Sequence, residues 1–167
     1  MATRRADLRD PSPDLLTDTA AAVVAARRLL GEAREAVLAK GGRGGRLDAD
    51  LLEREQHAAH GLAWLDVYVE ALAAMHGWAS GLREAGRLGE REALMLGFAF
   101  AEYSARIAGG IPMSQVEIVR PQDLGLGERA VQAFVAEPAV RRLVAEGGTA
   151  ERRARRGKSP DQRRSIS

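Results

Sequence analysis

The chain has 167 residues, which suits one domain, and a fold of about 150 residues buries roughly 70% of the surface of its unfolded chain. Apolar residues make up 46% of the sequence and aromatic residues only 4%, so the core is expected to come from alanine-rich helices that approach closely. The chain contains no cysteine, which excludes disulfides, thiolate metal sites and cysteine nucleophiles.

The formal net charge of +2 is unevenly distributed. Within residues 147–167, Glu151 and Asp161 are outnumbered by basic residues, namely Arg152, Arg153, Arg155, Arg156, Lys158, Arg163 and Arg164. The rest of the chain is therefore mildly acidic, and residues 147–167 are predicted to form a disordered basic tail. This tail has no aromatic side chain for base stacking, so at most nonspecific electrostatic association is expected of it, and nucleic acid is not an expected partner.

The sequence has no run of about 18 apolar residues and no apolar stretch typical of a signal sequence near its start. We therefore expect a soluble, cytoplasmic protein with no membrane partner. Residues 1–11 are polar and are expected to be a flexible N-terminus, followed by one helical domain over residues 12–146.

The first helix is predicted over residues 13–40, because Ser12 can cap it and Pro13 suits its first position. Apolar residues recur near a seven-residue spacing, as expected for one buried stripe: Leu16, Val23, Leu30 and Val37, with Ala20, Ala26 and Ala33. The glycine-rich segment 41–45 ends this helix and is interpreted as a linker, since it lacks the lysine and hydroxyl residue of a phosphate-binding loop.

A second, continuous helix is predicted over residues 49–85, with Asp48 as its cap. Gly61, Gly77 and Gly81 are places where it is expected to bend or to allow a close neighbour. Apolar residues occur on more than one side. One side carries Leu51, Ala58, Leu62, Leu65, Val69, Leu72 and Ala79, and another carries His57, His60 or Gly61, Trp64, Tyr68, Met75 and Trp78. This helix is therefore expected to be central and to contact several neighbours.

A third helix is predicted over residues 90–108, with a buried stripe of Leu94, Met95, Phe98, Ala101, Ala105 and Ala108. Ser114 and Glu117 read as the capping box of a short helix that Pro121 ends or redirects. Two further short helices are expected on either side of Pro138. The predicted fold is all-α: a bundle of three main helices with short C-terminal helices and a basic tail.

No catalytic signature is present in the sequence. His57, His60 and Glu53 can share a helix face, but a di-iron bundle requires a Glu-x-x-His motif twice, and Glu53 is followed three residues later by Gln56. We therefore assign no catalytic, cofactor-binding or metal-binding residue. Trp64, Tyr68, Met75 and Trp78 lie at helical spacing, and core, an interface with another domain or subunit, and a ligand pocket all remain open for them.

Three segments carry a resemblance to a known family: residues 56–65 with 68–72, residues 86–90, and residues 100–103 with 107–115. They resemble the N-terminal helical extension of (2S)-methylsuccinyl-CoA dehydrogenases, which are members of the acyl-CoA dehydrogenase superfamily. The resemblance covers residues 50–127, and Ile111-Pro112-Met113-Ser114-Gln115 is its most distinctive part.

The resemblance implies the context of a flavoprotein that oxidises methylsuccinyl-CoA to mesaconyl-CoA with FAD in the ethylmalonyl-CoA pathway. The family's flavin and acyl-CoA domains are expected to follow the extension, so this chain is expected to bind no FAD and to be inactive alone. The expected partner is an acyl-CoA dehydrogenase catalytic domain, in the same or a separate chain, and a homo-oligomer stays open. The contact candidates are Trp64, Tyr68, Trp78, Ile111, Met113 and Leu124. The alternative function is an independent helical adaptor whose basic tail binds acidic partners or nucleic acid.

Overall fold

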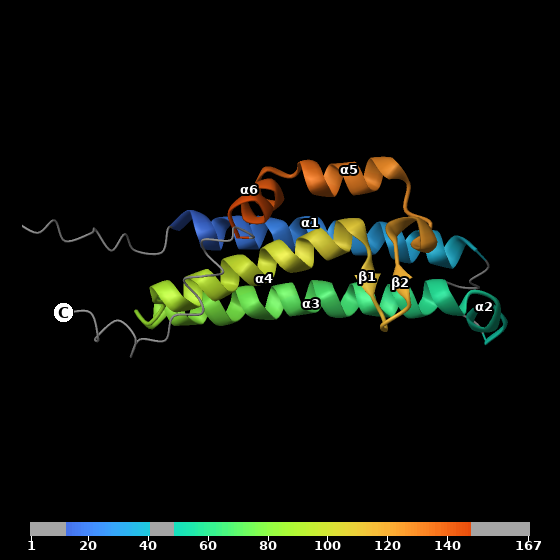
Figure 1. Ribbon diagram of the computed structural model, residues 1–167, viewed down its shortest axis with the longest axis horizontal. Helices are drawn as coiled ribbons and strands as arrows, with labels where there is room; N and C mark the ends of the chain where they lie inside the picture. The colour runs from blue at the N-terminus through green and yellow to red at the C-terminus, as the bar shows by residue number, and fades with distance from the viewer. Residues whose placement is uncertain (1–12, 41–48, 148–167) are drawn as a thin grey trace, which may run out of the picture.

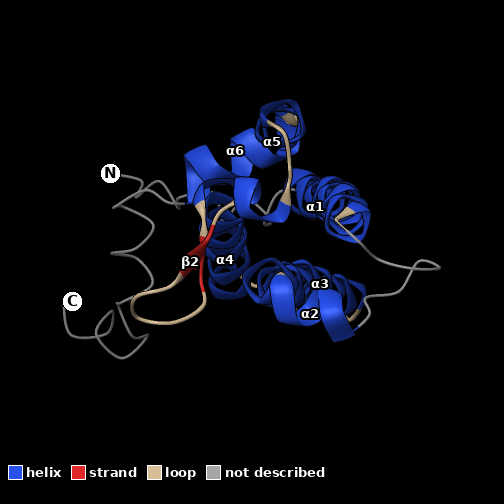
Figure 2. Cartoon of the chain, turned by 90° about the vertical axis from the view of Figure 1, so that its right-hand side faces the viewer, coloured by secondary structure: helices blue, strands red, loops and turns tan. Residues whose placement is uncertain are grey.

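The computed structural model describes residues 13–40 and 49–147, and in this part of the chain the predicted all-α class is confirmed. Three long helices, α1 (Pro13–Ala39), α3 (Gln56–Glu84) and α4 (Glu90–Gly109), lie side by side (Figure 1). Seen from the end, α5 (Glu128–Ala136) and α6 (Pro138–Gly147) cover one side of this bundle (Figure 2). No helix in the described part combines the length and the apolarity that crossing a membrane requires.

α1 follows the predicted range closely and supplies small residues to the core. Ala22, Ala26 and Ala33 are completely buried, which allows the close helix approach expected from the alanine-rich composition. Thr19 is also completely buried, and its hydroxyl donates to the backbone oxygen of Leu16 at 3.0 Å. Because that bond uses the only hydroxyl hydrogen, Thr19 accepts its second bond, at 2.9 Å, from Nδ1 of His76 on α3.

The prediction of one continuous helix over residues 49–85 is wrong in its continuity. The helix is broken into α2 (Ala49–Arg54) and α3 by Glu55, whose backbone has left the helical region at φ −116° and ψ 33°. Of the two roles expected for Gly61, a bend or a close neighbour, the structure shows the close neighbour. A Cβ at Gly61 would overlap the side chain of Val119, so glycine allows the segment that contains Val119 to lie directly on α3.

α4 begins where predicted and ends one residue later, at Gly109, but it has a different buried face. The residues that face the core are Leu96, Gly97, Phe100, Ala101, Ser104 and Ile107. Of the predicted stripe only Ala101 is fully buried, whereas Met95 is 42% exposed and Ala105 is exposed. The helix is apolar on two sides, and the side that includes Leu96 and Phe100 packs inward. The other side is left at the surface.

The prediction of a short helix that begins at Ser114 is also wrong, because residues 111–119 form a β-hairpin. β1 (Ile111–Pro112) pairs antiparallel with β2 (Ile118–Val119). The Ser114 hydroxyl does accept from backbone nitrogens, those of Val116 at 3.3 Å and Glu117 at 3.1 Å, but it closes a turn instead of starting a helix. Pro121 does not end a helix; it begins the 3₁₀ helix η1 (Pro121–Leu124).

Two short helices on either side of Pro138 are confirmed as α5 and α6. Glu137 is extended at φ −54° and ψ 122°, as expected for a residue before proline. Gly147 ends α6 and is buried against α4, where a Cβ would lie 2.7 Å from that of Ala101. The helical part thus includes Gly147, one residue beyond the predicted domain end. The predicted flexible N-terminus 1–11, the linker 41–45 and the rest of the basic tail lie outside the described residues.

Candidate docking surface

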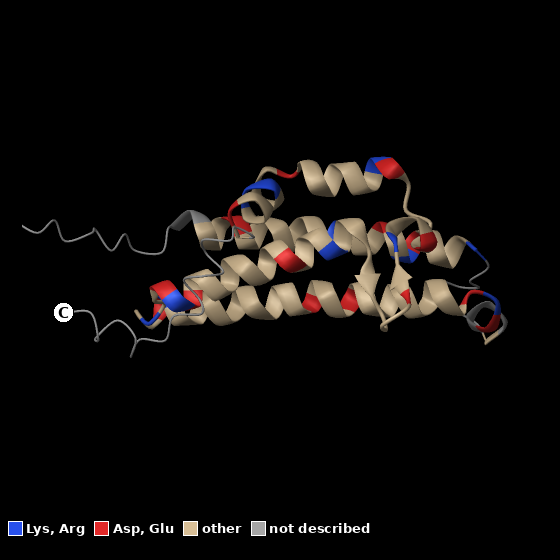
Figure 3. Cartoon of the chain, in the orientation of Figure 1, with Lys and Arg blue, Asp and Glu red and all other residues tan. Residues whose placement is uncertain are grey.

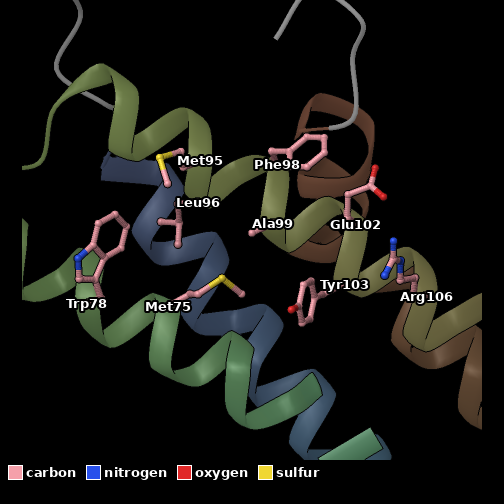
Figure 4. A pocket seen from close by; sticks show the side chains of 9 residues that line it. All are labelled: Met75, Trp78, Met95, Leu96, Phe98, Ala99, Glu102, Tyr103 and Arg106. Carbon is pink, nitrogen blue, oxygen red and sulfur yellow. The ribbon is translucent and has the colours of Figure 1, made fainter. Parts of the chain in front are cut away.

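The outward side of α4 and the adjoining part of α3 form an apolar groove with a volume of about 540 Å³ (Figure 4). α3 contributes Met75 and Trp78, and α4 contributes the other lining residues, namely Met95, Leu96, Phe98, Ala99, Glu102, Tyr103 and Arg106. Seven of these nine residues have no charge, and the two charged ones are one helical turn apart at the same end. We call this surface the α3–α4 groove.

The groove exposes large apolar side chains. Trp78 is 46% exposed and Met95 is 42% exposed, and Figure 4 shows them at one end of the groove, on opposite walls. No Asp, Glu, Lys or Arg occurs in residues 93–101 of α4 or in residues 71–82 of α3, and the corresponding stretches of ribbon are uncharged in Figure 3. A groove lined by exposed apolar side chains is a candidate binding surface.

The other end of the groove is polar and is held by contacts between α3 and α4. The rings of Tyr68 and Tyr103 have centroids 4.6 Å apart at an interplanar angle of 40°. Arg106 Nη1 donates to the Tyr68 hydroxyl at 3.4 Å, and this bond, with the nearby charge of Glu102, raises the pKa of Arg106 above its ordinary value. Arg106 is therefore a permanent cation, and Glu102 lies beside it.

This arrangement suits binding. Among the described residues, no three His, Asp or Glu side chains converge in a way that would hold a metal ion. The histidines considered in the sequence are engaged separately: His57 Nε2 lies 3.6 Å from Asp123 Oδ2, and His60 Nε2 accepts from Trp64 Nε1 at 3.1 Å. The groove itself is lined by no histidine, serine, threonine or lysine, and its ionisable side chains are Glu102, Tyr103 and Arg106.

The structure separates the six predicted contact residues into two groups. Tyr68, Ile111 and Leu124 are only 6%, 2% and 2% exposed and belong to the core, so the expectation that they face a partner is corrected. They are buried because the hairpin and η1 fold back onto α3. Trp64 and Met113 are partly buried and Trp78 is half exposed; for these three a partner contact stays a prediction.

Sequence reasoning did not identify the α4 wall of the groove. Met95 and Phe98 belong to the stripe that the sequence predicts to be buried, and no contact role is predicted for Tyr103. The sequence does contain an indication of this surface. α4 is apolar on two sides just as α3 is, so the argument that predicts several neighbours for α3 also predicts a second contact surface on α4.

No family model matches the chain. A comparison with characterised proteins finds 45% identity over 142 residues, which is 85% of this chain, in an enzyme from Cereibacter sphaeroides. That enzyme is (2S)-methylsuccinyl-CoA dehydrogenase. The predicted resemblance is confirmed, and the chain is homologous to part of an acyl-CoA dehydrogenase. It spans 25% of the length of that relative.

Proposed function

We propose that the chain is an accessory helical domain of an acyl-CoA dehydrogenase that resembles methylsuccinyl-CoA dehydrogenase, and that it packs against the catalytic part through the α3–α4 groove. The groove is the observation that carries this proposal. It is an apolar surface on which Trp78 and Met95 stay 46% and 42% exposed, on a chain that matches only a quarter of a dehydrogenase.

Energetics favour a protein surface as the occupant of the groove. Burying an exposed large apolar side chain contributes about 1.5–3 kcal/mol when burial is complete, and Trp78 and Met95 are each about half exposed. Met75 of α3 and Met95 of α4 lie on opposite walls of a groove whose other uncharged residues are aromatic or aliphatic, and flexible methionines adapt to the shape of a partner. A helix of the catalytic part, with apolar residues at i, i+3 and i+4, matches such a groove.

In this proposal FAD and the thioester substrate are bound by the catalytic part. The family implies FAD, whose diphosphate requires cationic side chains or a cluster of backbone N–H groups. The groove does not fit this group, because its only cation, Arg106, donates to Tyr68 and lies beside Glu102. We therefore derive no catalytic step from this chain. A cytoplasmic location and oxidation within the ethylmalonyl-CoA pathway belong to the same proposal.

A binding experiment with separate proteins tests the proposal. The chain is titrated calorimetrically into the part of the Cereibacter enzyme that lies outside the 142 matched residues. Met95→Asp is expected to weaken binding at least about tenfold, or about 1.4 kcal/mol, because it places a charge in an apolar interface. Val24→Asp is the matched control, since Val24 is 70% exposed on α1 and does not line the groove.

Two results would contradict the proposal: no binding by the wild-type chain, or a Met95→Asp variant that binds as tightly as the wild-type chain and the Val24→Asp control. In the second case the chain binds the dehydrogenase through a surface other than the groove. Circular dichroism of both variants checks that each retains the helical fold.

A further inference from the structure

The hairpin that replaces the predicted short helix has apolar side chains on both of its faces. Ile111 and Val119 pair across the strands and are 2% and 1% exposed, so this pair faces the core. Pro112 pairs with Ile118, and both are exposed, Ile118 to 46%. Because successive residues of a strand point to opposite faces, this second pair lies on the outer face.

Val116 extends the outer face into the turn. It is 91% exposed, the highest exposure among the large apolar residues of the described chain. We use the term hairpin outer face for Pro112, Val116 and Ile118. Turn positions are normally occupied by polar residues and glycine, so a fully exposed β-branched side chain is unusual here.

The hairpin is braced on both sides of this turn. Gly110 adopts a φ of 137°, which favours glycine, and directs the chain from α4 into β1. The backbone nitrogens of Met113 and Ser114 both donate to the Glu117 oxygen, at 2.9 and 3.3 Å. Val119 is seated on Gly61 of α3. The outer face is therefore presented by a defined structure.

The hairpin adjoins the polar end of the α3–α4 groove. The backbone nitrogen of Gly110, one residue before β1, donates to the backbone oxygen of Arg106 at 2.8 Å, and Arg106 lines the groove. Figure 1 shows the hairpin crossing α3 beside the end of α4. A partner that covers the groove along α3 and α4 therefore also reaches the hairpin.

We propose that the hairpin outer face is a second contact with the same dehydrogenase catalytic part, in which Val116 enters an apolar recess of that protein. This inference rests on the proposed function. Exposed polar side chains, Ser114, Gln115 and Glu117, surround Val116, so the recess is expected to have a polar rim with a hydrogen-bond donor or cation facing Glu117. The occupant is a folded protein surface and not a lipid or a nucleic acid.

Cysteine labelling tests this inference cleanly, because the chain has no cysteine of its own. Val116→Cys, Met95→Cys and Val24→Cys are made one at a time. Each is made in the isolated chain and in a full-length Cereibacter enzyme whose matched segment is replaced by this chain. Alkylation rates are read peptide by peptide by mass spectrometry, and retained dehydrogenase activity shows that the chimeric enzyme is folded.

In the full-length enzyme, alkylation at Val116→Cys and Met95→Cys is expected to slow at least about tenfold, because thiol reactivity depends on exposure, while Val24→Cys is unchanged. Slowing at Met95→Cys alone would overturn the hairpin contact and leave the proposed function intact. If neither site slows in the active enzyme, both proposals are overturned. Slowing at all three sites would also count against both proposals, because a slower rate at the control position would mean that the whole chain is less accessible in the full-length enzyme.

Discussion

Arg142 of α6 binds the carboxylate of Asp18 of α1 through two parallel hydrogen bonds. Nε donates to Oδ2 at 2.9 Å and Nη2 donates to Oδ1 at 2.6 Å. The Asp18 side chain is only 12% exposed, so this pair joins the last described helix to the first at a largely buried carboxylate. A two-point contact of this type also fixes the orientation of α6 over the bundle.

Arg142→Lys is expected to destabilise the fold although the charge is kept. A lysine ammonium cannot reproduce the planar two-bond contact, and a hydrogen bond to a charged group is worth about 1.5–3 kcal/mol. We expect a loss of roughly 1 kcal/mol or more, which lowers the thermal midpoint by about 2–4 °C for a chain of this size. Arg141→Lys, at the exposed neighbouring position, is the control. Equal midpoints for the two variants would show that the Asp18 contact adds nothing to stability.

Gly61→Ala is expected to loosen the base of the hairpin. The added methyl group would overlap Val119 and lie 3.1 Å from Leu124 Cδ2, which forces the hairpin away from α3. Overpacking of this kind costs about 1–3 kcal/mol. Gly77→Ala in the same helix has open space and is expected to gain about 0.5–1 kcal/mol from helix propensity. Urea unfolding measures both, and opposite signs are predicted; two gains would mean that the hairpin is not seated on Gly61.

Ser104→Ala is expected to stabilise the protein. The Ser104 hydroxyl is 1% exposed in the core face of α4 and has no hydrogen-bond partner among the described residues. Burying an unpaired hydroxyl costs about 1–3 kcal/mol in mutational studies, so its removal should gain about 1 kcal/mol. Thermal unfolding by circular dichroism is sufficient to detect this. A lower midpoint for the variant would indicate that Ser104 has a partner outside residues 13–40 and 49–147.

Helix boundaries were predicted well where one residue type sets them locally. Pro13 begins α1 and Pro138 begins α6, because proline suits a first helical position and pushes the residue before it out of the helix. The break at Glu55 has no such signal. At the break, Glu55 Oε2 accepts a hydrogen bond from Lys40 Nζ, one residue after α1, at 3.1 Å, and this contact joins positions 15 residues apart.

The face that α4 turns to the core could not be decided from its own sequence. Leu94, Met95 and Phe98 are as apolar as Leu96, Phe100 and Ile107, so either stripe satisfies the helical period. The choice depends on packing against α6, whose Gly147 approaches Gly97 and Ala101 so closely that a Cβ at position 147 would lie 2.7 Å from that of Ala101. The groove was missed for the same reason. The Ser114 turn was misread because a serine hydroxyl accepts the same backbone bonds in a turn as at a helix start.

Methionine methyl NMR tests the central claim, that the α3–α4 groove is covered by the dehydrogenase, most directly. The chain has four methionines, of which Met75 and Met95 line the groove and Met113 lies in the hairpin segment. Labelled chain is titrated with the unlabelled catalytic part of the Cereibacter enzyme. We predict that the methyl signals of Met75 and Met95 shift or broaden as the complex forms. A complex seen by size-exclusion chromatography in which both signals stay unchanged would contradict the claim.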